Sequence, residues 1–376
     1  MTGYLPACIG QPVGEVDTPA LLIDLDAFER NLAALNSSVA GRDVRVRAHA
    51  KTHKCPEIAL RQIAAGAVGV CCQKVGEAEA MVEGGVGDVM VSNEVVSASK
   101  LDRLALLARR ARIGVCVDDA GNVEALAAAA RAAAVTLDVY VEIDVGARRC
   151  GVAPGAAAVA LARKVQASRG LRFAGLQAYH GSAQHIRGMA ERRAAIEFAA
   201  AGVRATRDAL ADAGIECPIV AGAGSGSYLF EVETGAWNEL QPGSYVFMDA
   251  DYARNEWAAP LPRFEHALFV LATVMSHPAR GRAVLDAGLK ASSIDSGLPA
   301  VWGMPGVRYA RASDEHGVLE LAAEAPELRL GQKLLLVPGH CDPTVNLHDQ
   351  YVCVRGGIES GTVEALWPIT ARGPGH

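Results

Sequence analysis

The first three-fifths of the chain alternates short strand-like runs with helix-patterned segments, and this alternation constrains the fold more than any other feature. The alternation of β-rich runs with helix-patterned segments is typical of parallel βα units. Eight such runs occur, at residues 20–24, 45–50, 67–72, 88–92, 113–118, 137–144, 171–179 and 218–221. Ala-rich helical segments separate several of them, most clearly residues 122–134 and 156–167. Eight β/α units are enough to close a barrel.

An open, doubly wound sheet is the alternative, but it does not need eight units, and no GxGxxG motif follows the first run. A length of 376 residues favours two domains. From about residue 264 the pattern changes to β-rich runs broken by Gly, Pro and Asp. We therefore expect an α/β chain with a (β/α)8 TIM-like barrel over residues 17–260 and a mostly β domain over residues 261–376, with which residues 1–16 could pair.

Composition excludes several classes of protein. The net charge of −6 and the 5% aromatic content give neither a basic field nor stacking platforms for nucleic acid. No apolar run reaches the roughly 18 residues that a membrane helix needs, and the N-terminus does not resemble a secretory leader. The nine cysteines include no CxxC pair, which favours buried free thiols over disulfides or a zinc ribbon. We expect a cytoplasmic protein without nucleic-acid or membrane partners.

A crowded cationic cluster follows the second strand-like run. Lys51 lies among His49, His53 and Lys54. A free lysine with a pKa of about 10.4 is a poor nucleophile at neutral pH, but neighbouring cations favour its neutral form, which a Schiff-base lysine needs. A basic patch that only grips a phosphate or faces water is the other interpretation.

Further polar residues follow the carboxyl ends of other predicted strands, where barrel enzymes carry their active-site groups. Gln73 follows the third run, Arg149 the sixth, and Tyr179 ends the seventh. The Gly/Ser loop at residues 222–227 follows the eighth, and its backbone N–H groups and hydroxyls could hold a phosphate. A second loop at residues 241–245 offers similar donors, although a flexible turn is the commoner origin of such loops.

Several uncommon strings resemble the pyridoxal 5'-phosphate (PLP) enzymes with an alanine-racemase-type barrel (PLP fold type III), and within that family the D-threonine aldolases. They include residues 49–54, 71–74, 177–181, 248–252, 286–290, 314–317 and 340–344. The resemblance implies that Lys51 carries PLP as a Schiff base and that Arg149 faces the pyridine nitrogen, leaving it largely unprotonated. The remaining cofactor contacts that it implies are His49, Gln73, Tyr179, Ser225, Gly226, Gly243, Ser244 and Tyr252.

His340 and Asp342 form a candidate metal site. In an extended segment these two side chains would point to the same side, with Cys341 on the other. Two such ligands, completed by water and substrate oxygens, suit Mn²⁺ or Mg²⁺ better than a closed zinc site. A structural pair before Pro343 is the alternative, and the resemblance favours the metal. Related D-serine dehydratases carry His-x-Cys here, and the aspartate in this chain favours aldol cleavage over water elimination.

The resemblance implies a PLP- and metal-dependent lyase that splits D-β-hydroxy-α-amino acids such as D-threonine into glycine and an aldehyde. His340 is expected to hold the metal that acts on the substrate hydroxyl. The alternatives are a 3-hydroxy-D-aspartate aldolase giving glycine and glyoxylate, a D-serine-type dehydratase, and a non-catalytic PLP-binding protein. A homodimer is also implied. Candidate bases are His180, His185, His316 and His348, of which His316 in a polar turn is the best placed.

Overall fold

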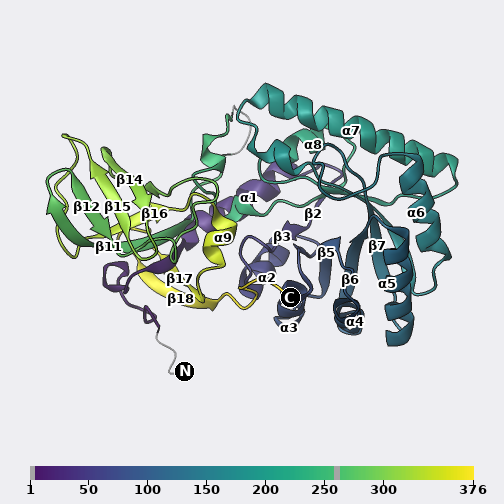
Figure 1. Ribbon diagram of the computed structural model, residues 1–376, viewed down its shortest axis with the longest axis horizontal. Helices are drawn as coiled ribbons and strands as arrows, with labels where there is room; N and C mark the ends of the chain where they lie inside the picture. The colour runs from purple at the N-terminus through teal and green to yellow at the C-terminus, as the bar shows by residue number, and fades with distance from the viewer. Residues whose placement is uncertain (1–4, 258–262) are drawn as a thin grey trace.

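The computed structural model describes residues 5–257 and 263–376, which form two lobes lying side by side (Figure 1). One lobe is a barrel whose nine hydrogen-bonded strands are all parallel. These strands are β2 (Arg45–Val46), β3 (Ala48–His49), β4 (Val70–Cys72), β5 (Asp88–Glu94), β6 (Arg112–Val117), β7 (Leu137–Glu142), β8 (Leu171–Ala178), β9 (Ile219–Gly222) and β10 (Glu239–Leu240). β2 pairs with β10 and β3 with β4, and only Arg47 separates β2 from β3, so the sheet closes. The expected TIM-like barrel is confirmed.

Two barrel strands differ from the prediction. Residues 20–24, expected as the first barrel strand, form β1 (Ala20–Asp24) in the other lobe, between β11 (Leu268–Ala279) and β17 (Gln350–Arg355). All five residues of β1 are buried, so their pattern is the same as that of a barrel strand. The barrel is completed instead by β10, whose two residues are too few to produce a periodic signal.

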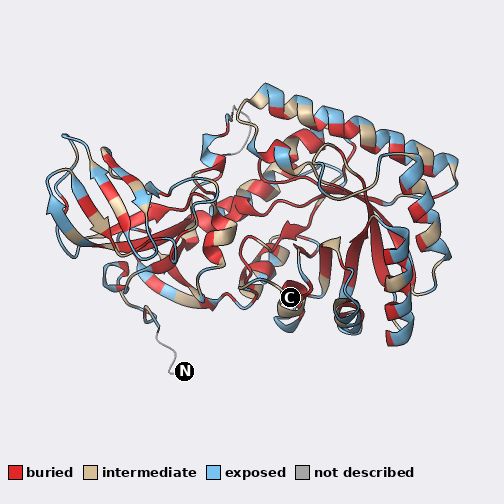
Figure 2. Ribbon diagram, viewed as in Figure 1, coloured by how far each residue is buried: buried red, intermediate tan, exposed pale blue. Residues whose placement is uncertain are grey.

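Helices cover the outside of the barrel, and their inward faces are buried (Figure 2). Cys71 and Cys72 show how the strands separate two cores: Cys71 packs inside the barrel and Cys72 packs against the helical layer, because successive side chains alternate across a strand. The helices of the chain are α1 (Leu25–Val39), α2 (Pro56–Ala64), α3 (Val75–Glu83), α4 (Ala98–Leu107), α5 (Ala120–Ala133), α6 (Ala156–Ala167), α7 (Met189–Asp212), α8 (Tyr228–Thr234) and, in the second lobe, α9 (Cys341–Val345).

Paired charges close the amino-terminal end of the barrel. Arg47 is 1% exposed and bonds Glu239 at 2.9 Å and Asp88 at 2.6 Å. Burial would lower the pKa of the Arg47 guanidinium, but the two carboxylates outweigh that effect and raise it. This end of the barrel is therefore filled by a structural ion-pair network, and the carboxyl ends of the strands are left to build a site.

The second lobe is a mostly antiparallel β domain, as expected. Besides β1, β11 and β17 it contains β12 (Arg282–Leu285), β13 (Ala300–Val301), β14 (Val307–Ala312), β15 (Gly317–Leu321), β16 (Lys333–Val337) and β18 (Thr362–Pro368). Near the N-terminus, Gly10 N donates to Val363 O at 2.7 Å and Val363 N to Gln11 O at 2.8 Å, so this segment runs along β18. The expected domain boundary between residues 260 and 261, and residues 1–4, lie outside the described residues.

Two expectations from composition can be compared with the fold. Six of the nine cysteines are buried, Cys8 is exposed, Cys150 and Cys217 are intermediate, and all nine are free thiols. Over the described ranges, no helix has both the length and the apolar character required to cross a bilayer.

Candidate active site

A cavity opens at the carboxyl ends of the barrel strands and is closed on one side by the second lobe. It contains eleven of the twelve residues expected to bind PLP or the metal. Parallel strands bring their carboxyl ends to the same rim, and α9 of the second lobe adds His340 and Asp342. The exception is Gly226, which lies behind the cavity wall and donates its N–H to Gln184 Oε1 at 3.0 Å. The lining residues are His49, Lys51, Thr52, Gln73, Ser92, Arg149, Gln177, Tyr179, His185, Ala223, Gly224, Ser225, Gln241, Gly243, Ser244, Tyr252, His340 and Asp342.

Lys51 follows β3 and projects into this cavity, with its Nζ 3.8 Å from Asp342 Oδ2. Its electrostatic environment differs from the sequence prediction. Burial lowers the pKa of Lys51, but Asp342 and Tyr179 outweigh burial, and the net shift is upward. Lys54 does not act as a neighbouring cation, because its Nζ is paired with Glu77 at 2.6 Å. The pKa of Lys51 is thus shifted upward in these surroundings, opposite to the direction that the sequence predicted.

His49 forms part of the cavity floor. Its ring nitrogens lie 3.3 Å from Lys51 N and 2.9 Å from Gln73 Nε2. Burial, followed by the charge of Lys51, lowers the pKa of His49 well below its ordinary value. A lowered pKa favours the neutral imidazole, and contacts at both ring nitrogens hold the ring in place, which suits packing against an aromatic ring better than proton transfer.

Arg149 faces the same space from the loop after β7. Its guanidinium carbon lies 5.7 Å from the centre of the Tyr179 ring, and its Nη2 lies 3.8 Å from Glu142 Oε1. Burial and the charge of Glu94 raise the pKa of Glu142. Because an arginine is always protonated, a pyridine nitrogen placed against Arg149 would remain a hydrogen-bond acceptor.

The two Gly/Ser loops form a cradle of the kind that holds phosphate. Among the described contacts, the N–H groups of Gly224, Ser225 and Gly243 donate to no protein acceptor. Thr52 adds a hydroxyl that is completely buried and has no partner in the described chain. A Cβ on Gly243 would lie 2.6 Å from Thr52 Oγ1, so only glycine allows the two to approach. These donors, with Lys51 and Arg149 on the same cavity, fit PLP.

His340 and Asp342 meet at the cavity wall, although not through an extended segment. His340 is the extended N-cap residue of α9, and Asp342 lies in the first turn of this helix. His340 Nε2 is 4.0 Å from Asp342 Oδ1, which is buried and has no hydrogen-bond partner in the described chain. Cys341 points the other way, its Sγ 3.5 Å from Met248 O. The pair supplies one nitrogen and one oxygen ligand and leaves the remaining positions open, which fits Mn²⁺ or Mg²⁺.

Asp295 orients His340. Its Oδ2 lies 2.8 Å from His340 Nδ1, so the ring donates there and keeps the lone pair of Nε2 on the side of Asp342. Asp249 holds the same segment by accepting from Cys341 N at 3.0 Å and from Tyr252 N at 2.9 Å. Hydrogen bonds from both lobes, through Asp249 and Asp295, therefore hold the His340–Asp342 segment in place.

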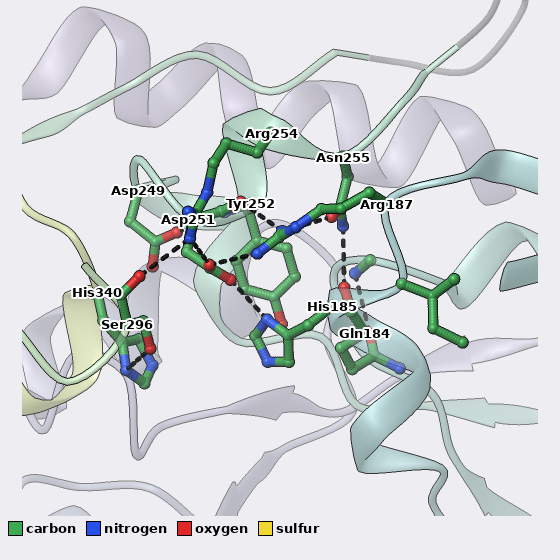
Figure 3. Close-up of polar contacts among 12 residues, drawn as sticks. Gln184, His185, Arg187, Asp249, Asp251, Tyr252, Arg254, Asn255, Ser296 and His340 are labelled. Carbon is green, nitrogen blue, oxygen red and sulfur yellow. Dashed lines mark hydrogen bonds and ion pairs between the residues drawn. The ribbon is translucent and has the colours of Figure 1, made fainter.

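Of the four candidate bases, His185, from the 3₁₀ helix η2 (Gly181–His185), lines the cavity, whereas His316 does not. His185 Nδ1 lies 2.6 Å from Asp251 Oδ2, and its ring centre is 5.3 Å from that of Tyr252 (Figure 3).

The other three candidate bases do not line the cavity. His316 lies in an exposed turn of the second lobe, while His180 contacts Ser182 Oγ and His348 contacts Ala291 O. The preference for His316 as a base is not supported by its position.

Sequence reasoning gave no individual role to several polar residues of the cavity, although all but Ser92 lie in motifs or loops that it had singled out. They are Thr52, Ser92, Gln177 and Gln241, each at the carboxyl end of a barrel strand or in the following residues. The sequence pattern that could have identified them is a polar residue at the end of an otherwise apolar strand-like run. A further group was missed as well: ligand atoms of Glu94, Asp118 and Cys150 all lie within 4.8 Å of one another.

The fold and the cavity together define a PLP enzyme of fold type III with an added β domain. Residues 23–251 match the family model of the alanine racemase N-terminal domain, and residues 267–354 match that of a putative serine dehydratase domain. The chain therefore belongs to the alanine racemase-type family of PLP-dependent enzymes.

Individual relatives narrow the class further. A D-threonine aldolase of Arthrobacter sp. is 50% identical over 98% of this chain and 96% of its own length. A 3-hydroxy-D-aspartate aldolase of Paracoccus denitrificans (strain Pd 1222) is 47% identical over 100% of this chain and 97% of its own length. The crystal structure of D-threonine aldolase from Filomicrobium marinum matches with a TM-score of 0.96 at 55% identity, covering 98% of this chain and 99% of that one. The chain is a PLP-dependent aldolase, a carbon–carbon lyase.

Proposed function

We propose that this enzyme cleaves the Cα–Cβ bond of D-configured β-hydroxy-α-amino acids, with D-threonine as the reference substrate, to give glycine and an aldehyde. The observation that carries the proposal is the meeting of Lys51 with the His340–Asp342 pair: Lys51 Nζ lies 3.8 Å from Asp342 Oδ2 across one cavity. A substrate held at Lys51 therefore has a metal-type site within reach of its β-hydroxyl.

The residues on one side of the cavity would bind PLP, and those on the other side would bind the metal and accept the proton of the substrate hydroxyl. PLP, when bound, supplies an electron sink for the carbanion that forms at Cα. Lys51 would hold it covalently, the loops around Ser225 and Ser244 would hold its phosphate, and Arg149 would face its ring nitrogen. His49, Gln73, Tyr179 and Tyr252 would position the ring. Gly226 would not contact PLP and would contribute only to the conformation of the Gly/Ser loop at residues 222–227.

On the other side, His340 and Asp342 would hold Mn²⁺ or Mg²⁺. Such an ion, when bound, supplies a Lewis acid that lowers the pKa of a hydroxyl. We assign the proton acceptor to His185. Because its Nδ1 donates to Asp251, its Nε2 carries the lone pair and can take the proton of the β-hydroxyl. Asp251 stays ionised, since its pKa is lowered by Arg187, His185 and Arg254, which outweigh burial.

Cleavage of 3-hydroxy-D-aspartate to glycine and glyoxylate is the second candidate, and the Paracoccus relative favours it. The distal carboxylate of that substrate needs a cation. The lysine and arginine residues that line the cavity in the described chain are Lys51 and Arg149, and both already have a role. Because no further lysine or arginine of the described cavity lining is left to bind a distal carboxylate, the site favours a substrate with a neutral side chain.

The test is product analysis with D-threonine, 3-hydroxy-D-aspartate and D-serine in parallel, with Mn²⁺ or Mg²⁺ and after EDTA. We expect glycine and acetaldehyde from D-threonine with added metal, and no aldehyde after chelation. Pyruvate and ammonia from D-serine as the main products would identify a dehydratase. D-Threonine cleavage that EDTA leaves unchanged would remove the metal from the mechanism.

We also propose that two chains assemble, each covering the cavity mouth of the other. Loops of the β domain carry exposed apolar side chains: Leu289 is 38%, Ile294 39% and Leu298 36% exposed, and the last two flank the residue 295–297 loop that contacts the His340 segment. A partner subunit would cover them. For location, the nine free thiols favour a reducing compartment such as the cytoplasm, which cell fractionation would test.

A further inference from the structure

Of the three histidines that line the cavity, two, one from each lobe, are fixed by a carboxylate in the same way. His185 comes from the barrel, and Asp251 binds its Nδ1 at 2.6 Å. His340 comes from the β domain, and Asp295 binds its Nδ1 at 2.8 Å. Because the carboxylate takes Nδ1 in both rings, both keep Nε2 as the free nitrogen. The distance between these two rings decides whether they can act on one substrate hydroxyl.

Arg254 connects the two pairs. It ends the short 3₁₀ helix η4 (Tyr252–Arg254), and its Nη2 contacts Asp251 Oδ1 and donates to the carbonyl oxygen of Ser296 at 2.9 Å. Ser296 follows Asp295, and its hydroxyl lies 3.0 Å from Asp295 Oδ2 and 3.4 Å from His340 Nδ1. Figure 3 shows Arg254 directed at Asp251, with His185 on one side of this carboxylate and Ser296 and His340 at the other end of the network.

We propose that Arg254 is a positioning residue that sets the spacing between His185 and His340 by tying Asp251 of the barrel to the residue 295–296 loop of the β domain. This inference rests on the proposed function, in which His340 holds the metal and His185 accepts the proton. The planar guanidinium can bond two acceptors in fixed directions, whereas a lysine ammonium acts as a point charge on a flexible stem. The Arg254 side chain is 56% exposed, so its role is geometric and its ion pair is screened by solvent.

Arg187 provides a matched control within the same network. Its Nη2 binds Asp251 Oδ1 at 2.5 Å, and its Nη1 binds Asp251 O and Asn255 Oδ1, both at 2.7 Å. It touches the same carboxylate as Arg254, but among the described contacts it has none with the residue 295–296 loop. Loss of Arg187 therefore affects the His185 side alone, while loss of Arg254 affects both sides.

The experiment compares Arg254→Met, Arg254→Lys and Arg187→Met, each purified with PLP and stripped of metal. Hydrogen exchange of residues 293–297 is measured first, and Mn²⁺ affinity is then measured from the free-ion electron paramagnetic resonance signal. We expect faster exchange of residues 293–297 and an Mn²⁺ Kd raised on the order of tenfold in Arg254→Met, with neither change in Arg187→Met. Both variants should lower kcat for D-threonine, because both disturb Asp251.

Arg254→Lys keeps a cation beside Asp251 but cannot bond Asp251 and Ser296 in the same fixed geometry. It should show the same two effects, and it replaces Arg254→Met if that variant does not fold. Unchanged exchange and an unchanged Mn²⁺ Kd in the Arg254 variants would overturn the inference and leave Arg254 as a support of Asp251 alone. If the wild-type enzyme binds no Mn²⁺, the proposed function fails, but the exchange measurement still decides whether Arg254 holds the loop.

Discussion

Lys51 is distinguished from the other lysines by its place on the cavity opposite Asp342, and Lys51→Ala tests this at the residue scale. The wild-type protein should be yellow, and borohydride reduction followed by peptide mapping should place the label on Lys51. The variant should lose the covalent link and about 10³-fold or more in rate. Lys74→Ala, which removes an exposed lysine nearby, is the control and should keep both. Label on any other lysine contradicts the assignment.

Glu231 is a second residue whose charge state the fold has altered. It is 1% exposed, accepts a hydrogen bond from Ser227 Oγ at 2.8 Å, and keeps Oε2 without a partner in the described chain. Burial raises its pKa from 4.5 to about 7. Because the folded-state pKa is the higher one, the contribution of Glu231 to stability is present below about pH 4.5 and is lost as the pH rises through about 7.

Glu231→Gln should therefore raise the free energy of unfolding at pH 8 by up to about 3 kcal/mol and change it little at pH 5. Thermal melts of wild type and variant at the two pH values provide the measurement. Glu233→Gln, which alters a half-exposed carboxylate on the same helix, is the control and should show no such pH dependence. An equal shift in Tm at both pH values would mean that Glu231 does not ionise within this range.

At the scale of elements, the approach of the segment before α9 to the residue 295–297 loop shapes the metal-type site. A Cβ on Gly339 would lie 2.0 Å from the carbonyl oxygen of Gly297, so the two backbones are in contact. Any side chain at Gly339 must push this loop, together with Asp295, away from His340.

We expect Gly339→Ala to destabilise the protein by about 1–3 kcal/mol and to weaken Mn²⁺ binding, while the visible spectrum of the PLP enzyme stays the same. The spectrum should be unaffected because Lys51 and the phosphate-type loops lie on the barrel. Gly87→Ala is the control, since nothing lies within 4 Å of its Cβ position. A Mn²⁺ Kd equal to that of wild type would show that the loop accommodates the methyl group.

For the whole molecule, the prediction concerns assembly. Ile294→Asp combined with Leu298→Asp places two charges on the partly exposed apolar loop beside His340, and should convert a dimer into a monomer. Light scattering at dilute concentration gives the mass, and D-threonine cleavage on the same samples gives the activity. Ile9→Asp, which changes an exposed apolar residue near the N-terminus, is the control. A wild-type monomer with full activity would refute the dimer.

The sequence alone determined the barrel, the β domain and most of the cavity. Parallel strands buried on both faces must be apolar along their length, so the alternation of strands and helices was readable without tertiary information. Polar residues such as Lys51, Gln73 and Arg149 could then be assigned to the strand ends where barrels place their chemistry. His340 and Asp342 were paired on the expectation of an extended segment, and the structure brings them together instead at the start of α9.

Only the tertiary structure decided which lobe β1 joins, because its five buried residues suit either sheet. It also placed Asp342, nearly three hundred residues away along the chain, where its charge raises the pKa of Lys51 against the effect of burial. His185, Asp251, Arg254 and Asp295 gain their roles from contacts across lobes or between distant loops. Periodicity and spacing depend on neighbours along the chain. The charge of a side chain, the tautomer of a histidine and the hydrogen bonds that orient them depend on neighbours in space, which the sequence by itself does not reveal.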